Sequence, residues 1–166
     1  NKGKIMSSDE LYKIIARVIE REGGERLTNG PDDPGGITKW GISQVHNPSL
    51  DVPNLTLQEA VEVYRTSYWK KSKAYSLPDR LQEIYFDMVV NMGRKRAVMI
   101  LQKACNHKGS KLAVDGGLGK LTLSACKKLE PHRLTAFRCL YYAELVTRKP
   151  TLMKYYYGWF RRSIEV

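Results

Sequence analysis

The sequence of 166 residues contains no apolar run long enough to cross a membrane. Its longest apolar stretches, residues 84–86 and 88–90, are separated by Asp87 and fall far short of the roughly 20 residues that span a bilayer. Residues 1–9 also lack the apolar core of a secretory signal. These absences predict a protein without membrane insertion that is either cytosolic or already processed.

Cysteine is scarce as well, because the chain has only Cys105, Cys126 and Cys139, with no pair at CxxC spacing. Three scattered histidines show no metal-ligand spacing, which argues against a zinc site. Each cysteine lies in an apolar helical pattern, so we expect buried free thiols in a reducing compartment. A cysteine–histidine nucleophile has no local signature here. We therefore predict neither a metal nor a cofactor.

Acidic residues are few relative to basic ones: 17 Asp and Glu stand against 28 Lys and Arg, a net charge of +11. A positive field of this kind attracts polyanions, and nucleic acid, an anionic membrane and the bacterial cell wall all fit it. No recognised nucleic-acid-binding motif is present, so a specific nucleic-acid partner is not expected. The length and the hydrophobic content of 42% are typical of one compact domain, or of one with a small module built into it.

Helical signals dominate the chain and predict a mainly α fold. The first helix opens at a capping box of Ser7 and Glu10 and ends at Gly23-Gly24. From Glu25 to Pro53 the residues are those of turns, so we expect one short irregular β-hairpin there, and a loop region of this length is more often functional than idle. Apolar periodicity then predicts further helices over residues 56–75, 78–93, 94–106, 121–129, 131–148 and 151–162.

Glu22 lies on the inward face of the first helix, at its last turn. It falls about 20° from Leu11 around the helix, whereas Glu20 falls near 180°. Partial burial and the negative end of the helix dipole favour the protonated carboxyl there, although a basic neighbourhood would oppose them. A general acid needs such a proton. Glu22 is thus a candidate general acid, and the alternative is a glutamate that reaches solvent or pairs with an arginine.

The loop after this helix supplies further candidate groups. Residues 32–36 read Asp-Asp-Pro-Gly-Gly, and the hydroxyl of Thr38 follows. A glycosidase needs a proton donor on one side of the scissile bond and a second carboxylate on the other, which Asp33 or Asp32 would provide. Trp40 is a candidate for stacking on a sugar face. Taken alone, residues 32–36 also fit an ordinary turn.

The stretch Glu22-Gly23-Gly24, followed by Asp-Pro-Gly-Gly-Ile-Thr-Lys-Trp-Gly-Ile at residues 33–42, resembles the signature of glycoside hydrolase family 108. These are phage and bacterial N-acetylmuramidases of lysozyme type, so the resemblance implies a lysozyme-like helical domain. It implies that Glu22 is the essential catalytic acid. The order Glu, Asp, Thr is similar to that of phage-type lysozymes, which implies that Asp33 and Thr38 handle the water, with Asp32 as a near alternative.

The downstream sequence resembles the peptidoglycan-binding module found with this family, at residues 97–106, 114–119, 122–123 and 158–162. The resemblance implies a catalytic part at residues 1–93 and a helical peptidoglycan-binding part at residues 94–166. We expect both parts in the same globule, because no Pro- or Ser-rich linker precedes Arg94. With Trp40, the residues Asn91 and Asp115 are the candidate substrate-binding residues.

The resemblance implies an endolysin that lyses bacteria by cleaving the β-1,4 bond between N-acetylmuramic acid and N-acetylglucosamine in peptidoglycan. An alternative is a non-catalytic peptidoglycan-binding or secretion-activating protein of the same fold, since Glu25 and Ile37 depart from the family's usual residues. Transglycosylase chemistry also stays open. By family analogy, the protein waits in the host cytoplasm and reaches the periplasmic wall after holin-type permeabilisation. We expect a monomer.

Overall fold

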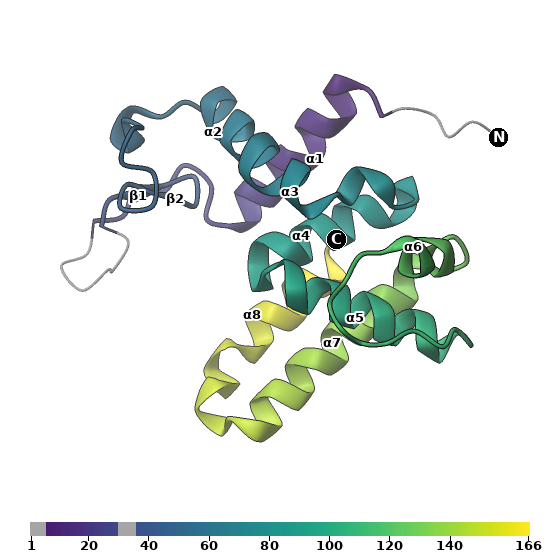
Figure 1. Cartoon of the computed structure of the whole chain (residues 1–166). Helices are drawn as coiled ribbons and strands as arrows, with labels where there is room; N and C mark the ends of the chain where they lie inside the picture. Colours follow the sequence, from purple (N-terminus) through teal and green to yellow (C-terminus); the bar gives the residue numbers. More distant parts are fainter. Residues whose placement is uncertain (1–5, 30–35) are drawn as a thin grey trace. The chain divides into compact units, whose positions relative to one another are not determined.

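The computed structural model describes residues 6–29 and 36–166 (Figure 1). The chain divides into two compact units, residues 1–71 and residues 72–166. None of the helices in the described residues has the length and apolarity that crossing a membrane requires. The boundary predicted between residues 93 and 94 falls inside the second unit, between two of its helices, and stays a prediction.

Helix α1, Ser8–Arg21, is the first element of the first unit. It begins at the predicted capping box, in which the Ser7 hydroxyl accepts from the Glu10 N–H at 3.1 Å and the Glu10 carboxylate accepts from the Ser7 N–H at 2.9 Å. The helix packs against α2, Leu57–Tyr64. Its buried apolar residues recur at helical spacing and are Ile14, Ile15, Val18 and Ile19.

Helix α2 begins at the second capping box, formed by Thr56 and Glu59. After α2 the backbone widens into a π-helix, Arg65–Trp69, and then continues as the short α3, Lys70–Ser72. A π-helical turn inserts an extra residue per turn and occurs often at functional sites. Periodicity alone predicts one helix through this region, because an apolar stripe does not reveal the inserted residue.

A short hairpin lies between α1 and α2 in the chain. Strands β1, Thr38–Lys39, and β2, Ile42–Ser43, pair antiparallel, with Thr38 opposite Ser43 and Lys39 opposite Ile42. The return loop to α2 is fixed by Gln44, whose amide donates to the carbonyl of Leu50 at 2.7 Å and accepts from the N–H of Val52 at 3.2 Å. These hydrogen bonds give the hairpin a defined connection to α2.

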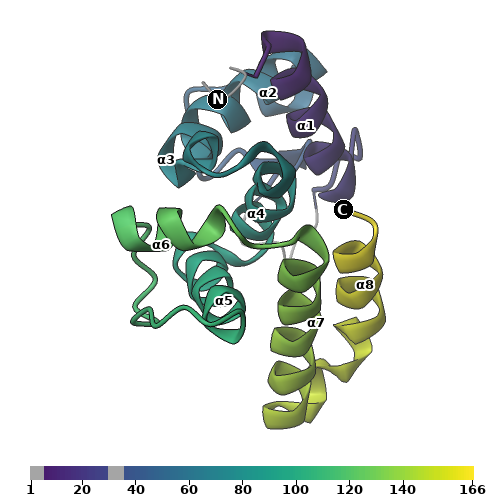
Figure 2. The same ribbon diagram turned by 90° about the vertical axis from the view of Figure 1, so that its right-hand side faces the viewer.

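The second unit consists of helices and the segments that join them. Its helices are α4 (Asp79–Met92), α5 (Arg94–His107), α6 (Lys120–Cys126), α7 (Pro131–Arg148) and α8 (Met153–Ile164). A longer loop over residues 108–119 joins α5 and α6. Helix α5 packs against α4, α6 and α7. Helices α7 and α8 lie side by side, joined through a 3-10 turn at Pro150–Leu152 (Figure 2).

A buried ion pair links three of these helices. Asp87 of α4 is fully buried and accepts from Arg138 of α7 at 2.7 Å and from Arg162 of α8 at 3.0 Å. Arg138 is itself fully buried. Because a buried charge is costly without its partners, these contacts hold α4, α7 and α8 in one arrangement.

The fold class predicted from the sequence, mainly α with a short hairpin after the first helix, is confirmed. The three cysteines are free thiols, also as predicted. Cys105 and Cys126 are buried, with their Sγ atoms 3.9 Å apart, whereas Cys139 is only half-buried.

Candidate active site

Glu22 occupies the C-cap of α1, where its backbone N–H turns back to the carbonyls of the last helical turn. Gly23 and Gly24 follow with φ of 117° and 58°, conformations that glycine adopts without strain, and the helix therefore ends here as predicted. The side chain of Glu22 is half-buried, and its Oε1 atom is shielded from solvent. The carboxyl group of Glu22 is thus partly sheltered from solvent at the end of α1.

The hairpin turn lies directly against Glu22. Trp40 and Gly41 form this two-residue turn with φ of 55° and 70°, the left-handed geometry of a tight hairpin. A Cβ at position 41 would lie 3.1 Å from the Cβ of Glu22 and 2.5 Å from the hydroxyl of Tyr64. Only glycine therefore fits, and its missing side chain lets the hairpin backbone approach the carboxyl-bearing residue closely.

Trp40 is held inside the first unit. Its indole N–H donates to the carbonyl of Leu55 at 2.8 Å, and its own carbonyl accepts from the Tyr64 hydroxyl at 3.1 Å. Only 9% of Trp40 is exposed, so its ring is a core residue that fixes the turn. This burial argues against the stacking on a sugar face that the sequence suggested, since a buried ring presents no free face.

Tyr68 is a further residue of this site, in the stretch that the apolar periodicity predicts as helix, residues 56–75. It lies in the π-helix, and its ring stacks on that of Tyr64 at a centroid distance of 5.0 Å. Burial raises the pKa of Tyr68, and the nearby charge of Glu22 raises this pKa further. The phenol consequently stays protonated, and with 38% of the residue exposed it offers both a ring and a hydroxyl beside Glu22.

Thr38 lies on the same hairpin, at the start of β1. Its backbone exchanges two hydrogen bonds with Thr28, at 2.8 and 2.9 Å, which ties the chain before the loop to the chain after it. The Thr38 hydroxyl is part-buried and makes a long 3.5 Å contact with the Gly36 carbonyl. Asp33 and its alternative Asp32 lie outside the described residues, so the second carboxylate stays a prediction.

The two remaining predicted residues belong to the unit of residues 72–166. Asn91 accepts hydrogen bonds from Tyr142 and, at 3.4 Å, from Arg138, beside the buried ion pair. Asp115 is exposed but accepts from the Gln102 amide at 2.8 Å and from the Gly117 N–H at 2.7 Å. These hydrogen bonds hold the pKa of Asp115 below its usual value. Both side chains therefore accept hydrogen bonds from other residues of this unit.

Within residues 6–29 and 36–166, no group of three or more His, Cys, Asp and Glu side chains is arranged to hold a metal ion. The described site instead consists of one carboxyl group, a close backbone turn and two stacked tyrosines. This arrangement suits proton transfer to a substrate oxygen at Glu22.

Comparisons with known proteins find two matching families and a similar solved structure. Residues 15–93 match the glycosyl hydrolase 108 family, and residues 96–164 match a family described as a predicted peptidoglycan domain. The solved structure of SagA from Brucella abortus is similar, with 27% sequence identity and a TM-score of 0.72 over 96% of this chain and 92% of that one. No match is found among curated proteins.

The two family matches cover most of the chain and meet between α4 and α5. They support a glycoside hydrolase that acts on peptidoglycan, with a mainly α lysozyme-like fold. The chain thus carries a match to the glycosyl hydrolase 108 family over residues 15–93 and a match to the predicted peptidoglycan domain family over residues 96–164.

Proposed function

We propose that the protein is an N-acetylmuramidase that hydrolyses the β-1,4 bond between N-acetylmuramic acid and N-acetylglucosamine in peptidoglycan. The observation that supports this most strongly is the position of Glu22, half-buried at the end of α1 against the Gly41 turn. Glycosidic bond cleavage requires a proton donor beside the scissile bond, and a half-buried carboxyl group against a backbone turn suits that role.

In this proposal Glu22 protonates the glycosidic oxygen as the bond to the leaving sugar breaks. Asp33, assisted by Thr38, orients the attacking water or stabilises the positive charge that develops on the ring, and Asp32 is the alternative for this role. Tyr68, beside Glu22, contacts the sugar. The separation of the two carboxyl groups decides between inversion and retention of configuration.

We infer from the family resemblance that the chain acts as an endolysin in bacteriophage lysis, made in the host cytoplasm and released to the wall by a holin-type lesion. Expression of the full chain in a Gram-negative host is then expected to lyse cells only when the inner membrane is permeabilised. Lysis without permeabilisation would contradict this part of the proposal. Light scattering that gives the 19.0 kDa chain mass would support a monomer.

The test of the chemistry compares wild-type protein with Glu22→Gln on purified peptidoglycan. New reducing ends are reduced with borohydride and identified by mass spectrometry. We expect reduced muramic acid ends from the wild type and a rate at least about a hundredfold lower for Glu22→Gln, because the proton donor is removed. Glu25→Gln, an exposed carboxyl three residues further on, is the matched control and is expected to keep full activity.

The other outcomes separate the alternatives. Anhydro ends from the wild type would keep Glu22 as the acid but make the reaction a transglycosylation. Binding to the wall without new ends from either protein would indicate a non-catalytic peptidoglycan-binding protein. Equal activity of the wild type and Glu22→Gln would exclude Glu22 as the proton donor.

A further inference from the structure

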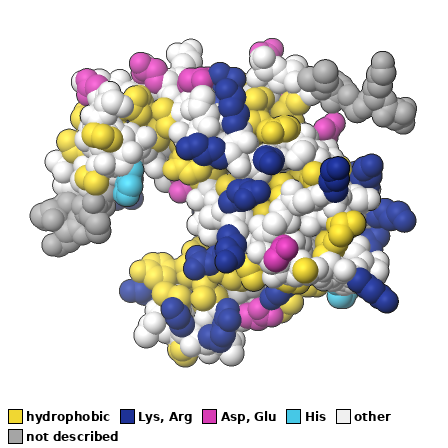
Figure 3. All heavy atoms as spheres, viewed as in Figure 1, with side chains coloured by type: hydrophobic (Ala, Val, Ile, Leu, Met, Phe, Trp, Pro, Cys, Tyr) yellow, Lys and Arg dark blue, Asp and Glu magenta, His cyan; other side chains and the backbone are white. Residues whose placement is uncertain are grey.

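The positive charge of the chain resides in one unit. Residues 1–71 contain ten Lys and Arg and ten Asp and Glu, whereas residues 72–166 contain eighteen and seven. The whole net charge of +11 therefore belongs to the unit that includes the predicted peptidoglycan domain. On the face in Figure 3, several basic side chains lie near α6, and others are spread over the rest of the face.

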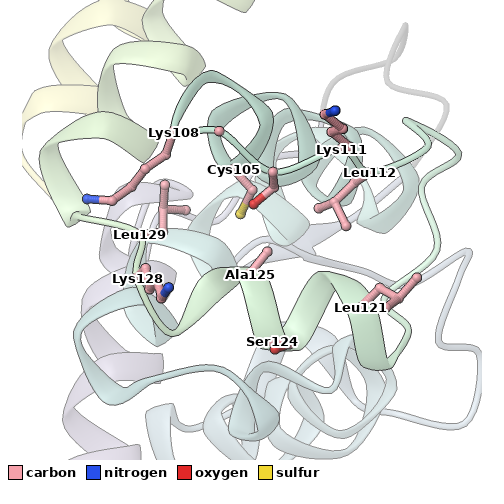
Figure 4. Close-up of a pocket in the computed structure, with 11 residues that line it drawn as sticks. Cys105, Lys108, Lys111, Leu112, Leu121, Ser124, Ala125, Lys128 and Leu129 are labelled. Atoms are coloured by element: carbon pink, nitrogen blue, oxygen red, sulfur yellow. The ribbon is translucent and has the colours of Figure 1, made fainter.

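A pocket of about 440 Å³ lies among these lysines, between the end of α5, the loop after it and α6 (Figure 4). Its apolar wall includes Leu112, Ala125 and Leu129, with Cys105 between them. Leu121, which is 78% exposed, extends the apolar surface at one end. The volume lies in the range of pockets that hold small ligands.

Lysines surround this apolar wall. Lys108, Lys111 and Lys128 all line the pocket (Figure 4). Lys108 is already engaged by Glu130, whereas Lys111 and Lys128 are exposed. The pocket therefore presents two accessible ammonium groups next to an aliphatic surface, a combination that suits a ligand with carboxylates and small apolar groups.

An adjoining hollow of about 330 Å³ shares Lys111, Leu112 and Leu121 with the first. It contains a further lysine, Lys120, and one acidic group, Asp115, whose hydrogen bonds keep it ionised. We call the two neighbouring hollows together the lysine groove, defined by the lining residues of both pockets. The carboxylate of Asp115 would repel a continuous polyanion that ran through the lysine groove. The same carboxylate would attract an ammonium group on a ligand.

We propose that the lysine groove binds the peptide stem of peptidoglycan through its carboxylates. This inference rests on the proposed function, in which the substrate is peptidoglycan. The N-acetyl sugars of the glycan strand carry no free carboxylate where a peptide is attached. The peptide stem is therefore the component whose carboxylates the lysines can recognise. Its alanine methyl groups match the aliphatic wall, and the free ammonium of a diamino acid in the stem matches Asp115.

The test uses the free tetrapeptide L-alanyl-γ-D-glutamyl-meso-diaminopimeloyl-D-alanine and the full chain, with binding followed by NMR chemical shifts and calorimetry. We expect the wild type to bind, with shift changes confined to the lysine groove. Replacing Lys111 and Lys128 by Glu is expected to weaken binding about tenfold or more, because two attractive charges become repulsive. Replacing Lys127 and Lys154 by Glu is the matched control, since both are exposed lysines outside the groove.

The tetrapeptide contains no glycosidic bond, so its binding is independent of the hydrolytic proposal. Retained binding by Glu22→Gln would support a groove that works separately from the chemistry. No binding of the tetrapeptide to the wild type, or an equal loss in both double variants, would overturn the groove even if the hydrolysis is confirmed. Tighter binding of inorganic polyphosphate than of the tetrapeptide would assign the groove to phosphate-bearing polymers and would also overturn the proposal.

Discussion

At the residue scale, the site depends on how closely Gly41 approaches Glu22 and Tyr64. Gly41→Ala would place a Cβ 2.5 Å from the Tyr64 hydroxyl at a φ of 70°. The left-handed backbone costs about 1–2 kcal/mol for a residue with a Cβ, and overpacking adds about 1–3 kcal/mol. We expect Gly41→Ala to lower the free energy of unfolding by about 2–5 kcal/mol, measured by urea denaturation, and to reduce hydrolysis because Glu22 is displaced.

The matched control is Gly158→Ala. Gly158 lies inside α8, where no atom stands within 4 Å of an added Cβ. Alanine is the better helix former by about 0.5–1 kcal/mol, so this variant is expected to be slightly more stable than the wild type. A Gly41→Ala protein as stable and active as the wild type would show that the close approach to Glu22 is not required.

Tyr68 allows a second test at this scale, because its ring and its hydroxyl can be removed separately. Tyr68→Ala removes a half-exposed ring beside Glu22. We expect the KM for soluble peptidoglycan fragments to rise about tenfold, which corresponds to the loss of a stacking contact of about 1.4 kcal/mol. Tyr68→Phe keeps the ring and is expected to raise KM much less. Tyr157→Ala, which removes a more exposed ring from α8, controls for general loss of aromatic surface. Equal KM values for Tyr68→Ala and the wild type would place the sugar elsewhere.

The residues of this site differ in how well the sequence predicts them. The inward position of Glu22 could be predicted, because its angle around α1 follows directly from its place in the chain. Its role as the proton donor stays a prediction. Gly41 and Tyr68 could not be placed beside it, since their contacts depend on tertiary packing and on a π-helical turn that leaves no mark in the apolar pattern. The stacking role suggested for Trp40 is not supported, because composition does not separate a buried indole from an exposed one.

At the element scale, helix starts are local and predictable, whereas helix packing is not. The capping boxes at Ser7 and Thr56 are formed by residues three apart, so the sequence alone reveals them. The contacts of Asp87 with α7 and α8 join residues more than fifty positions apart, and no local pattern indicates them. This difference explains why the helices are predicted well and the arrangement of Asn91 with Tyr142 is not.

Asp87→Asn tests this arrangement. The substitution would leave the guanidinium groups of Arg138 and Arg162 without their buried carboxylate. Breaking a buried pair in this way costs about 3–5 kcal/mol, so we expect the unfolding free energy of the unit at residues 72–166 to fall by about that amount in urea denaturation. Glu144→Gln is the control, because its 3.9 Å pair with Lys103 is exposed and contributes about 1 kcal/mol or less. A small, equal effect of both variants would show that the buried pair does not hold the helices.

At the scale of the whole molecule, the uneven charge predicts how the protein meets the cell wall. The unit at residues 1–71 is formally neutral, and the unit at residues 72–166 carries all of the +11. Attraction to an anionic wall therefore belongs to the second unit, while the candidate catalytic residues Glu22 and Thr38 belong to the first. Salt is expected to weaken wall binding more than the hydrolysis of a small soluble fragment, because only the polymer engages many charges at once.

Charge variants in each unit can show which basic residues cause this salt dependence. Raising the ionic strength from about 0.01 M to about 0.15 M shortens the Debye length from about 30 Å to about 8 Å. We therefore expect a smaller fraction of the Glu22→Gln protein to sediment with insoluble peptidoglycan at the higher salt concentration. Two fourfold glutamine variants lower the net charge equally, one in each unit. The first set, in residues 72–166, is Lys111, Lys120, Lys127 and Lys128, and the second set, in residues 1–71, is Lys13, Arg26, Lys70 and Lys71.

All eight side chains are exposed, so both variants are expected to fold. If attraction is local, the first set weakens wall binding at low salt and flattens its salt dependence, whereas the second set leaves both nearly unchanged. Equal effects of the two sets would mean that the wall senses only the total charge of the molecule. Binding that does not change with salt in any variant would mean that contacts other than charge hold the protein on peptidoglycan, and the role given to the basic unit would then be wrong.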